Sequence, residues 1–105
     1  MYNPKINKEM HIYTEEDFRI ANVVGREEVK RTYRMSLGSC RELLDVVNMT
    51  FDMFDAEPTA EEDSELAETY QYLYMTTERF IAYQYGDEEL QLFRKEIGKY
   101  KKDIA

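Results

Sequence analysis

Apolar residues recur every three or four positions through most of this sequence after Thr14. The C-terminal segment is the most regular, with a spacing of 3, 4, 3, 4 between Leu90, Phe93, Ile97, Tyr100 and Ile104. This period places the apolar side chains on one face of an α-helix, whereas a half-buried strand alternates apolar and polar residues. The chain is therefore predicted to be all-α, with helices that each bury a single stripe.

Glycines and capping residues divide the repeating pattern into separate helices. Thr14, followed by three acidic residues, predicts the start of a first helix, which Gly25 ends. A second helix begins at Arg26 and ends at Gly38, since glycine favours helix ends. Gly86 separates the last two helices in the same way.

Two sequence patterns of the capping-box type predict the starts of the third and fourth helices. Ser39 and Glu42, three residues apart, can satisfy each other's free backbone amides at the start of the third helix. Thr59 and Glu62 repeat the pattern before a fourth helix over about 60–85. As an alternative, the second and third helices form one kinked rod, because the apolar stripe continues in phase between them.

The expected architecture is a single domain over 14–105, an irregular bundle of four to five helices, preceded by an extended N-terminal arm over 1–13. A chain of 105 residues is too short for two independent cores. The following residues are predicted to fill the one core: Val29, Tyr33, Leu43, Leu44, Val47, Phe51, Leu66, Leu73, Phe80, Leu90, Phe93 and Ile97.

The cellular compartment is predicted from the single cysteine and from hydropathy. Cys40 has no second cysteine with which to form a disulfide, so a cytoplasmic location is expected. No apolar run approaches the roughly 20 residues that span a bilayer, and the first residues lack the apolar segment of a signal peptide. Neither membrane association nor export is expected.

Negative charge is concentrated in the middle of the chain. The stretch 42–89 contains 14 Asp and Glu residues against one base, Arg79, and so holds 13 net negative charges, whereas the whole chain carries −8. Both flanking stretches are therefore net positive. Such separation predicts a protein partner with a basic surface. The overall acidity argues against direct binding to nucleic acid, because phosphate contacts need Lys and Arg.

Roughly half of these acids stand at predicted helix starts, where the helix dipole explains them. Five others are predicted to form one acidic face: Asp45, Asp52, Asp55, Glu65 and Glu68. Carboxylates three or four residues apart on a helix lie roughly 5–6 Å apart, near the spacing of phosphates along a nucleic-acid strand. The face is therefore predicted to occupy a basic, nucleic-acid-handling surface of another protein. The alternative is an ordinary solvated face.

In size, in acidity and in lacking a catalytic pattern, the chain is similar to small phage and mobile-element inhibitors of CRISPR effectors and restriction enzymes. The similarity is one of overall character, and no motif carries it. It implies an inhibitor or regulator that acts as a DNA mimic, as some anti-CRISPR proteins do.

A second row of residues follows the fourth predicted helix, away from its apolar stripe. The row consists of Tyr72, Met75, Arg79 and Tyr83. Tyrosine offers a large contact area and a hydroxyl group, so the row is predicted to bind a partner or, in a homodimer, a second copy of the chain. Its alternative role is to fill the core between two helices. A dimeric assembly or scaffold protein is accordingly one alternative function.

The second predicted helix is rich in basic residues, namely Arg26, Lys30, Arg31 and Arg34. With the preceding helix it resembles a helix-turn-helix unit, which implies a small DNA-binding regulator as a further alternative. The pattern departs from that unit at Arg26, where an apolar turn residue is usual. The preferred interpretation is that Lys30 and Arg34 pair with Glu27, Glu28 or the acidic middle of the chain.

The sequence contains no pattern typical of catalytic, metal-binding or cofactor-binding residues. The acidic loop after Asp55 lacks the alternating oxygen ligands and the central glycine of a calcium loop. The only histidine, His11, lies near the N-terminus, so a carboxylate and histidine metal site is not predicted. Cys40 falls on the apolar face of its helix, which favours a structural thiol. The chain is therefore predicted to be a non-enzymatic protein-binding module without a cofactor.

Overall fold

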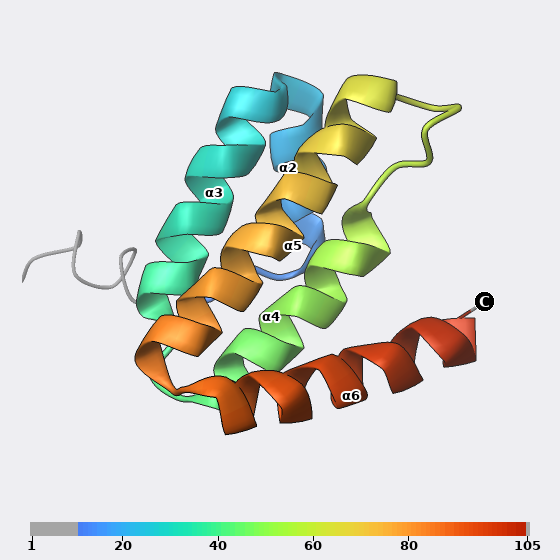
Figure 1. The fold of residues 1–105 in the computed structure, drawn as a ribbon. Coiled ribbons are helices and arrows are strands. Elements are labelled where there is room, and N and C mark those ends of the chain that lie inside the picture. Colours follow the sequence, from blue (N-terminus) through green and yellow to red (C-terminus); the bar gives the residue numbers. More distant parts are fainter. Residues whose placement is uncertain (1–10, 105) are drawn as a thin grey trace, which may run out of the picture.

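The computed structural model describes the backbone of residues 11–104 and the side chains of residues 11–101. Five helices account for most of this range (Figure 1). They are α2 (Glu15–Val24), α3 (Arg26–Ser39), α4 (Leu43–Ala56), α5 (Ser64–Gln84) and α6 (Asp87–Ile104). The prediction of an all-α bundle is confirmed. Most of the predicted N-terminal arm, residues 1–10, lies outside the described residues.

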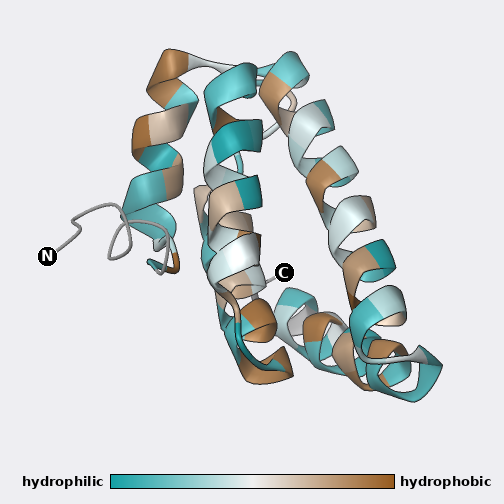
Figure 2. Cartoon of the chain, turned by 90° about the vertical axis from the view of Figure 1, so that its left-hand side faces the viewer, coloured by the Kyte–Doolittle hydropathy of each residue, from teal (hydrophilic) through white to brown (hydrophobic). Residues whose placement is uncertain are grey.

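The helices form a layered bundle with α2 and α5 on opposite sides. In Figure 1, α5 lies between α3 and α4 in the front of the bundle, α2 lies behind, and α6 crosses the lower end. Helix α2 packs against α3 and α4, whereas α5 packs against α3, α4 and α6. The view in Figure 2 shows α2 and α5 on either side of α3. Each of these two helices therefore has an outward face of its own.

Helix α2 begins and ends where the sequence predicts. The backbone N–H of Thr14 donates to the Asp17 carboxylate at 2.8 Å as part of a capping box at the helix start. Gly25 is the single residue between α2 and α3, and its φ of 131° lies in a region that favours glycine. Helix α3 can therefore turn back at once and pack along α2.

The predicted capping box at Ser39 is wrong. Ser39 is the last residue of α3 and is buried, and its hydroxyl donates to the Met35 carbonyl oxygen at 3.1 Å. Helix α4 instead begins after Glu42, whose backbone N–H donates to the Asp45 carboxylate at 3.2 Å. The extended backbone of Cys40 separates the two helices, so the alternative of one kinked rod is wrong as well.

The second predicted capping box forms but does not start a helix. The Thr59 backbone N–H donates to the Glu62 carboxylate at 2.8 Å, and the Glu62 N–H donates to the Thr59 hydroxyl at 3.2 Å. These bonds close a turn, and α5 begins only at Ser64. Asp63 supplies the actual cap by accepting the Leu66 N–H at 3.0 Å. The helix therefore starts four residues later than predicted.

One continuous core occupies the space between the helices. Of the twelve residues predicted to fill it, eight are buried: Val29, Tyr33, Val47, Leu66, Leu73, Leu90, Phe93 and Ile97. Three more are partly buried against it: Leu43, Phe51 and Phe80. Leu44 is 60% exposed, so its prediction is wrong. The reason is the orientation of α4, which turns Val46 and Met49 inward instead.

Two buried tyrosines are joined to neighbouring helices by hydrogen bonds. The Tyr70 hydroxyl on α5 donates to Asn22 Oδ1 on α2 at 2.7 Å, and Asn22 Nδ2 donates to the Ala56 carbonyl oxygen at 2.9 Å. The hydroxyl groups of Tyr33 and Thr77 join α3 to α5 in the same way. Burial raises the pKa of both tyrosines, so both stay neutral. These two polar bridges fix the inner side of α5 against α2 and α3.

Candidate interaction surface

The side of α5 that faces away from the core carries large side chains. Tyr72, Met75 and Tyr83 are 57%, 54% and 88% exposed. Arg79 is exposed as well and lies between Met75 and Tyr83 along the helix. The structure therefore places the predicted aromatic row on the surface, on the helix whose opposite side forms the centre of the core.

Two residues of the predicted acidic face share this side of α5. At roughly 100° of rotation per residue, Glu65 and Glu68 project within the same arc of roughly 80° as the aromatic row. Both acids are exposed. We name the combined set the α5 stripe: Glu65, Glu68, Tyr72, Met75, Arg79 and Tyr83. The stripe runs along the helix, with its acids at the N-terminal end.

Basic residues of α3 flank the acidic end of the α5 stripe. The Lys30 ammonium lies 5.5 Å from the centre of the Tyr72 ring and 4.0 Å from a Glu27 carboxylate oxygen. A hollow of about 190 Å³ is lined by Arg26, Lys30, Glu65, Glu68, Thr69 and Tyr72. The two acids of the stripe therefore have cations of α3 as neighbours.

Helix α6 borders the stripe through an ion pair with α5. The Arg94 guanidinium donates to both oxygens of the Glu78 carboxylate, at 3.0 and 3.3 Å. Such a two-point contact holds the two planar groups in one relative orientation. Met75, Arg79 and Arg94 help to line a second hollow of about 190 Å³ beside this pair. The C-terminal half of the stripe is thus supported by α6.

The other three residues of the predicted acidic face lie elsewhere, and two of them have hydrogen-bond partners within the chain. Asp45 caps α4. The Asp55 carboxylate accepts a hydrogen bond from the Tyr100 hydroxyl, and the Asp55 carbonyl oxygen accepts one from Arg19 at 2.6 Å. Asp52 is half-buried near Asp55. The structure therefore divides the predicted face between α5, the start of α4, and a junction of α2, α4 and α6.

The pKa values of one aspartate and one tyrosine are raised at this junction. Burial raises the pKa of Asp52, and the charges of Asp55 and Glu15 raise it further. The pKa of Tyr100 rises to about 12, chiefly because its hydroxyl is hydrogen-bonded to the Asp55 carboxylate. Phe51 stacks on the Tyr100 ring, with 4.2 Å between the ring centroids. The sequence analysis placed Tyr100 on the apolar stripe of the last helix but missed its contact with Asp55, which lies 45 residues away in the chain.

The basic residues proposed for DNA binding are partly neutralised within α3. Arg31 lies 3.2 Å from Glu28, and Lys30 lies 4.0 Å from Glu27. The predicted internal pairing is therefore observed for Lys30, and Arg31 is paired as well, whereas Arg34 and Arg26 are exposed. The helix-turn-helix interpretation stays a prediction, on a connection between α2 and α3 that is one residue long.

The cysteine is placed as a structural residue. Cys40 is half-buried, and its Sγ donates to the Ser36 carbonyl oxygen at 3.4 Å. Burial raises the pKa of this thiol to about 12, which keeps it protonated at neutral pH. Within the part of the chain that the structure describes, no group of three or more His, Cys, Asp and Glu side chains is placed to hold a metal ion. None of the helices in that part combines the length and the apolar composition that crossing a membrane requires.

The outward face of α2 carries a second exposed apolar surface, which sequence reasoning missed. Ile20, Val23 and Val24 are 57%, 88% and 70% exposed. We name these three residues the α2 patch. Figure 2 shows hydrophobic, brown bands along the upper part of α2. Their positions at i, i+3 and i+4 place the three residues on one side of a helix, and this spacing is the signal in the sequence that could have indicated them.

The sequence matches no protein-family model, and no curated protein and no solved structure shows significant similarity to it.

Proposed function

We propose that the chain is a non-enzymatic protein-binding module that docks on a basic protein surface through the α5 stripe. The observation that carries this proposal is the exposure of Tyr72, Met75 and Tyr83 in line with two acids on one helix face. Tyrosine and methionine are enriched in protein interfaces, where tyrosine is a frequent anchor residue and methionine adapts to irregular pockets. Docking would remove these side chains from water.

Charges next to the α5 stripe indicate the kind of partner. The segment before α5 contributes Glu61, Glu62 and Asp63, which are all exposed and directly precede the acidic end of the stripe. Clustered carboxylates steer a basic surface toward the chain and repel an acidic one. A partner that presents Lys and Arg beside an apolar pocket therefore fits the stripe best.

Proteins that handle nucleic acids carry such basic surfaces. We therefore propose that the chain is an inhibitor or regulator that occupies one of them as a nucleic-acid mimic, in the manner of phage and mobile-element proteins of the anti-CRISPR type. Five exposed acids supply the mimicry: Glu61, Glu62, Asp63, Glu65 and Glu68. A cytoplasmic location, where such targets work, is part of the proposal.

Photo-crosslinking in a host lysate tests the docking step. The full chain carries p-benzoylphenylalanine in place of Tyr83, and a control carries it in place of Gln91, which is exposed on α6. The proposal expects a protein adduct from the first position and none from the second. Equal adducts from both positions, or none from either, would contradict it.

Competition with duplex DNA tests the mimicry step on the captured protein. An excess of DNA should displace the wild-type chain, and the double variant Glu65→Gln, Glu68→Gln should bind at least about tenfold more weakly. A control with the same loss of charge, Glu16→Gln with Glu96→Gln, should bind as the wild type does, because both residues are exposed on other helices. A complex that DNA does not displace would leave the binding module standing and overturn the mimicry.

A DNA-binding regulator is the competing function, and the exposure of Arg26 and Arg34 on α3 favours it. It predicts direct binding of the isolated chain to duplex DNA, with an affinity that falls steeply as salt rises. Fluorescence anisotropy at low and high salt measures this binding. A chain that leaves free DNA unbound at low salt is not such a regulator.

A further inference from the structure

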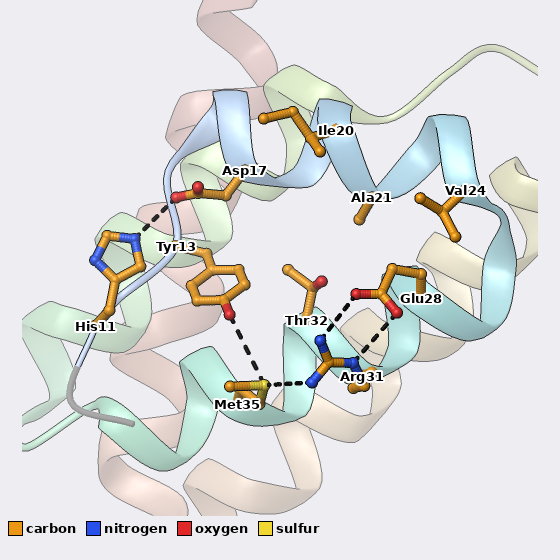
Figure 3. Close-up of a pocket in the computed structure, with 10 residues that line it drawn as sticks. All are labelled: His11, Tyr13, Asp17, Ile20, Ala21, Val24, Glu28, Arg31, Thr32 and Met35. Atoms are coloured by element: carbon orange, nitrogen blue, oxygen red, sulfur yellow. Dashed lines mark hydrogen bonds and ion pairs between the residues drawn. The ribbon is translucent and has the colours of Figure 1, made fainter. Parts of the chain in front are cut away.

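The α2 patch lies beside a groove between α2 and α3, which Figure 3 shows in close-up. The groove has a volume of about 520 Å³. Its apolar lining comes from Ile20, Ala21 and Val24 on α2 and from Met35 on α3. Two of the three patch residues are thus part of the groove wall, and the third, Val23, is not.

Polar side chains surround the apolar part of the groove. His11 Nε2 lies 3.0 Å from the Asp17 carboxylate near one end, and Arg31 lies 3.2 Å from the Glu28 carboxylate on the α3 side (Figure 3). The Tyr13 hydroxyl also lines the groove and approaches the Met35 sulfur at 3.8 Å. An apolar centre with a polar rim is the usual anatomy of a protein interface.

Val23 stands three residues after Ile20 and directly before Val24, which both line the groove, so it forms a ridge beside it. It is the most exposed residue of the α2 patch, at 88%. A ridge and a groove side by side on one face are complementary to themselves, because a two-fold axis brings the ridge of each copy to the groove of the other. Valine is β-branched and has one strongly preferred rotamer in a helix, so the ridge gives up little conformational freedom on binding.

The charge distribution leaves this side of the molecule open to a second copy. The groove and the hollow beside it are lined by three acids, Asp17, Glu27 and Glu28, and by three bases, Arg26, Arg31 and Arg34. Residues 42–89 carry 13 net negative charges, so two copies that met through α4 or α5 would repel each other. Near the α2 patch both signs are present, with Arg26 and Arg31 close to Glu27 and Glu28.

We infer that a second copy of this chain covers the α2 patch, in a two-fold dimer in which Val23 of each protomer enters the α2–α3 groove of the other. The dimer removes three exposed apolar side chains of each protomer from water. Because α5 lies on the opposite side of the bundle, the dimer presents two α5 stripes outward (Figure 2). Two linked docking surfaces raise the effective affinity for a partner that offers two sites. The dimer itself does not depend on the proposed function.

Sedimentation equilibrium of the full chain tests the dimer, whose mass is twice 12.6 kDa. Val23→Lys should raise the dissociation constant of the dimer at least about tenfold, because it places a charge against an apolar groove. Tyr83→Lys is the matched control, since residue 83 is also 88% exposed but lies on α5, and it should leave the constant unchanged. Lysine near the C-terminal end of α2 agrees with the helix dipole, and circular dichroism checks that the helix is kept.

Isotope-filtered NMR on a mixed sample of labelled and unlabelled wild-type chains provides a second measurement. It should show contacts between the Val23 methyl groups of one protomer and the Met35 methyl group of the other. A chain that stays monomeric up to about 1 mM overturns the inference, as does a dimer that Tyr83→Lys disrupts and Val23→Lys does not. Occupation of the groove by another segment of the same chain, or by a different protein, would leave the isolated chain monomeric. If the chain dimerises as expected but photo-crosslinking at residue 83 yields no protein adduct, the result counts against the proposed function and not against the dimer.

Discussion

The α5 stripe and the α2 patch are equally exposed at their most prominent residues, yet they lie in different electrostatic surroundings. Tyr83 and Val23 are both 88% exposed. The stripe begins within a run of five exposed acids in residues 61–68. The hollows beside the patch are instead lined by three acids and three arginines: Asp17, Glu27, Glu28, Arg26, Arg31 and Arg34. Exposure alone therefore does not indicate what a surface binds. The surrounding charge distinguishes a face suited to a foreign basic partner from a face suited to a second copy.

The side chains of the two surfaces also differ in stiffness. The α2 patch consists of Ile and Val, which are β-branched and restricted about their first side-chain torsion. The α5 stripe contains tyrosines with a polar hydroxyl and a methionine with a flexible thioether. The patch is therefore suited to one fixed counterpart, and the stripe to a partner surface of varied shape.

Removal of the large side chains of the α5 stripe should have the largest effect, because it should weaken partner binding and leave dimerisation unchanged. Replacing Tyr72, Met75 and Tyr83 together by Ala should weaken binding to the captured partner at least about 100-fold, or about 2.7 kcal/mol, because anchor residues commonly contribute about 2 kcal/mol each. Dimerisation should not change. Calorimetric titration and sedimentation equilibrium measure the two processes. Parallel loss of both would show that the surfaces are not independent.

Replacing Asn22 should lower the stability of the fold, because its side chain joins α2 to α5 through a hydrogen bond with Tyr70. Asn22→Ala leaves the Tyr70 hydroxyl and the Ala56 carbonyl oxygen without their present partner, which should lower the unfolding free energy by about 2 kcal/mol. Urea denaturation measures the change. The control Asn48→Ala, at an exposed site on α4, should stay within about 0.5 kcal/mol of the wild type. Similar values for both variants would rule out a structural role for the bridge.

Salt should weaken partner binding at the α5 stripe about tenfold and should have little effect on dimerisation at the α2 patch. Raising the ionic strength from about 0.05 M to about 0.5 M shortens the Debye length and should weaken partner binding at the acidic end of the α5 stripe about tenfold. The dimer, which buries mainly apolar groups, should change by less than about twofold. Parallel titrations of both equilibria measure the contrast. An equal response of the two would remove the electrostatic distinction between them.

Asp52 should be replaceable with a gain in stability at neutral pH. Burial, with the charges of Asp55 and Glu15, raises its pKa above 3.8 in the folded state. Its favourable contribution is present at low pH and is lost as the pH rises through the folded-state pKa. Asp52→Asn should therefore raise the unfolding free energy at neutral pH by about 0.5 kcal/mol, a figure reduced for solvent screening. Thermal unfolding across pH should show the gain disappearing in acid, and a gain independent of pH would contradict this cause.

Replacing Asp17, at the start of α2, should have the smallest effect on the unfolding free energy, and it should destabilise the fold where replacing Asp52 stabilises it. Partial burial acts to raise its pKa, but hydrogen bonds from Thr14 and His11 lower it overall from 3.8. Its contribution is present above the unfolded-state pKa and is lost as the pH falls through the folded-state pKa. Asp17→Asn should lower the unfolding free energy at neutral pH by less than about 0.5 kcal/mol. The same pH series measures it, and stabilisation would contradict the hydrogen-bond assignment.

Helix type and buried stripes could be predicted because both depend on local spacing. Val29, Tyr33 and Leu37 stand four residues apart, and all three are buried. Helix ends were less predictable, since Ser39 and Glu42 compete for the start of α4. Ser39 becomes the last residue of α3 and does not cap α4. Which of the two residues caps α4 depends on how α3 and α4 pack rather than on the capping pattern.

The candidate site was predictable only within single helices. The aromatic row follows from the period of α5 alone, but the predicted acidic face joined residues of α4 and α5 without knowledge of their relative orientation. Contacts that span long stretches of chain, 45 residues from Asp55 to Tyr100 and 48 from Asn22 to Tyr70, depend on tertiary packing. Local patterns carry no information on such contacts.

Helix α6 packs across α4 and α5 (Figure 1). It attaches through the apolar stripe of Leu90, Phe93 and Ile97 and through two polar contacts, Arg94 with Glu78 and Tyr100 with Asp55. Its detachment would leave intact the polar bridges that Tyr33 and Tyr70 form with neighbouring helices. A segment that can leave while the rest stays folded opens as a separate cooperative unit. Native-state hydrogen exchange should therefore show the amides of α6 opening at a lower free energy than those of α3 and α5.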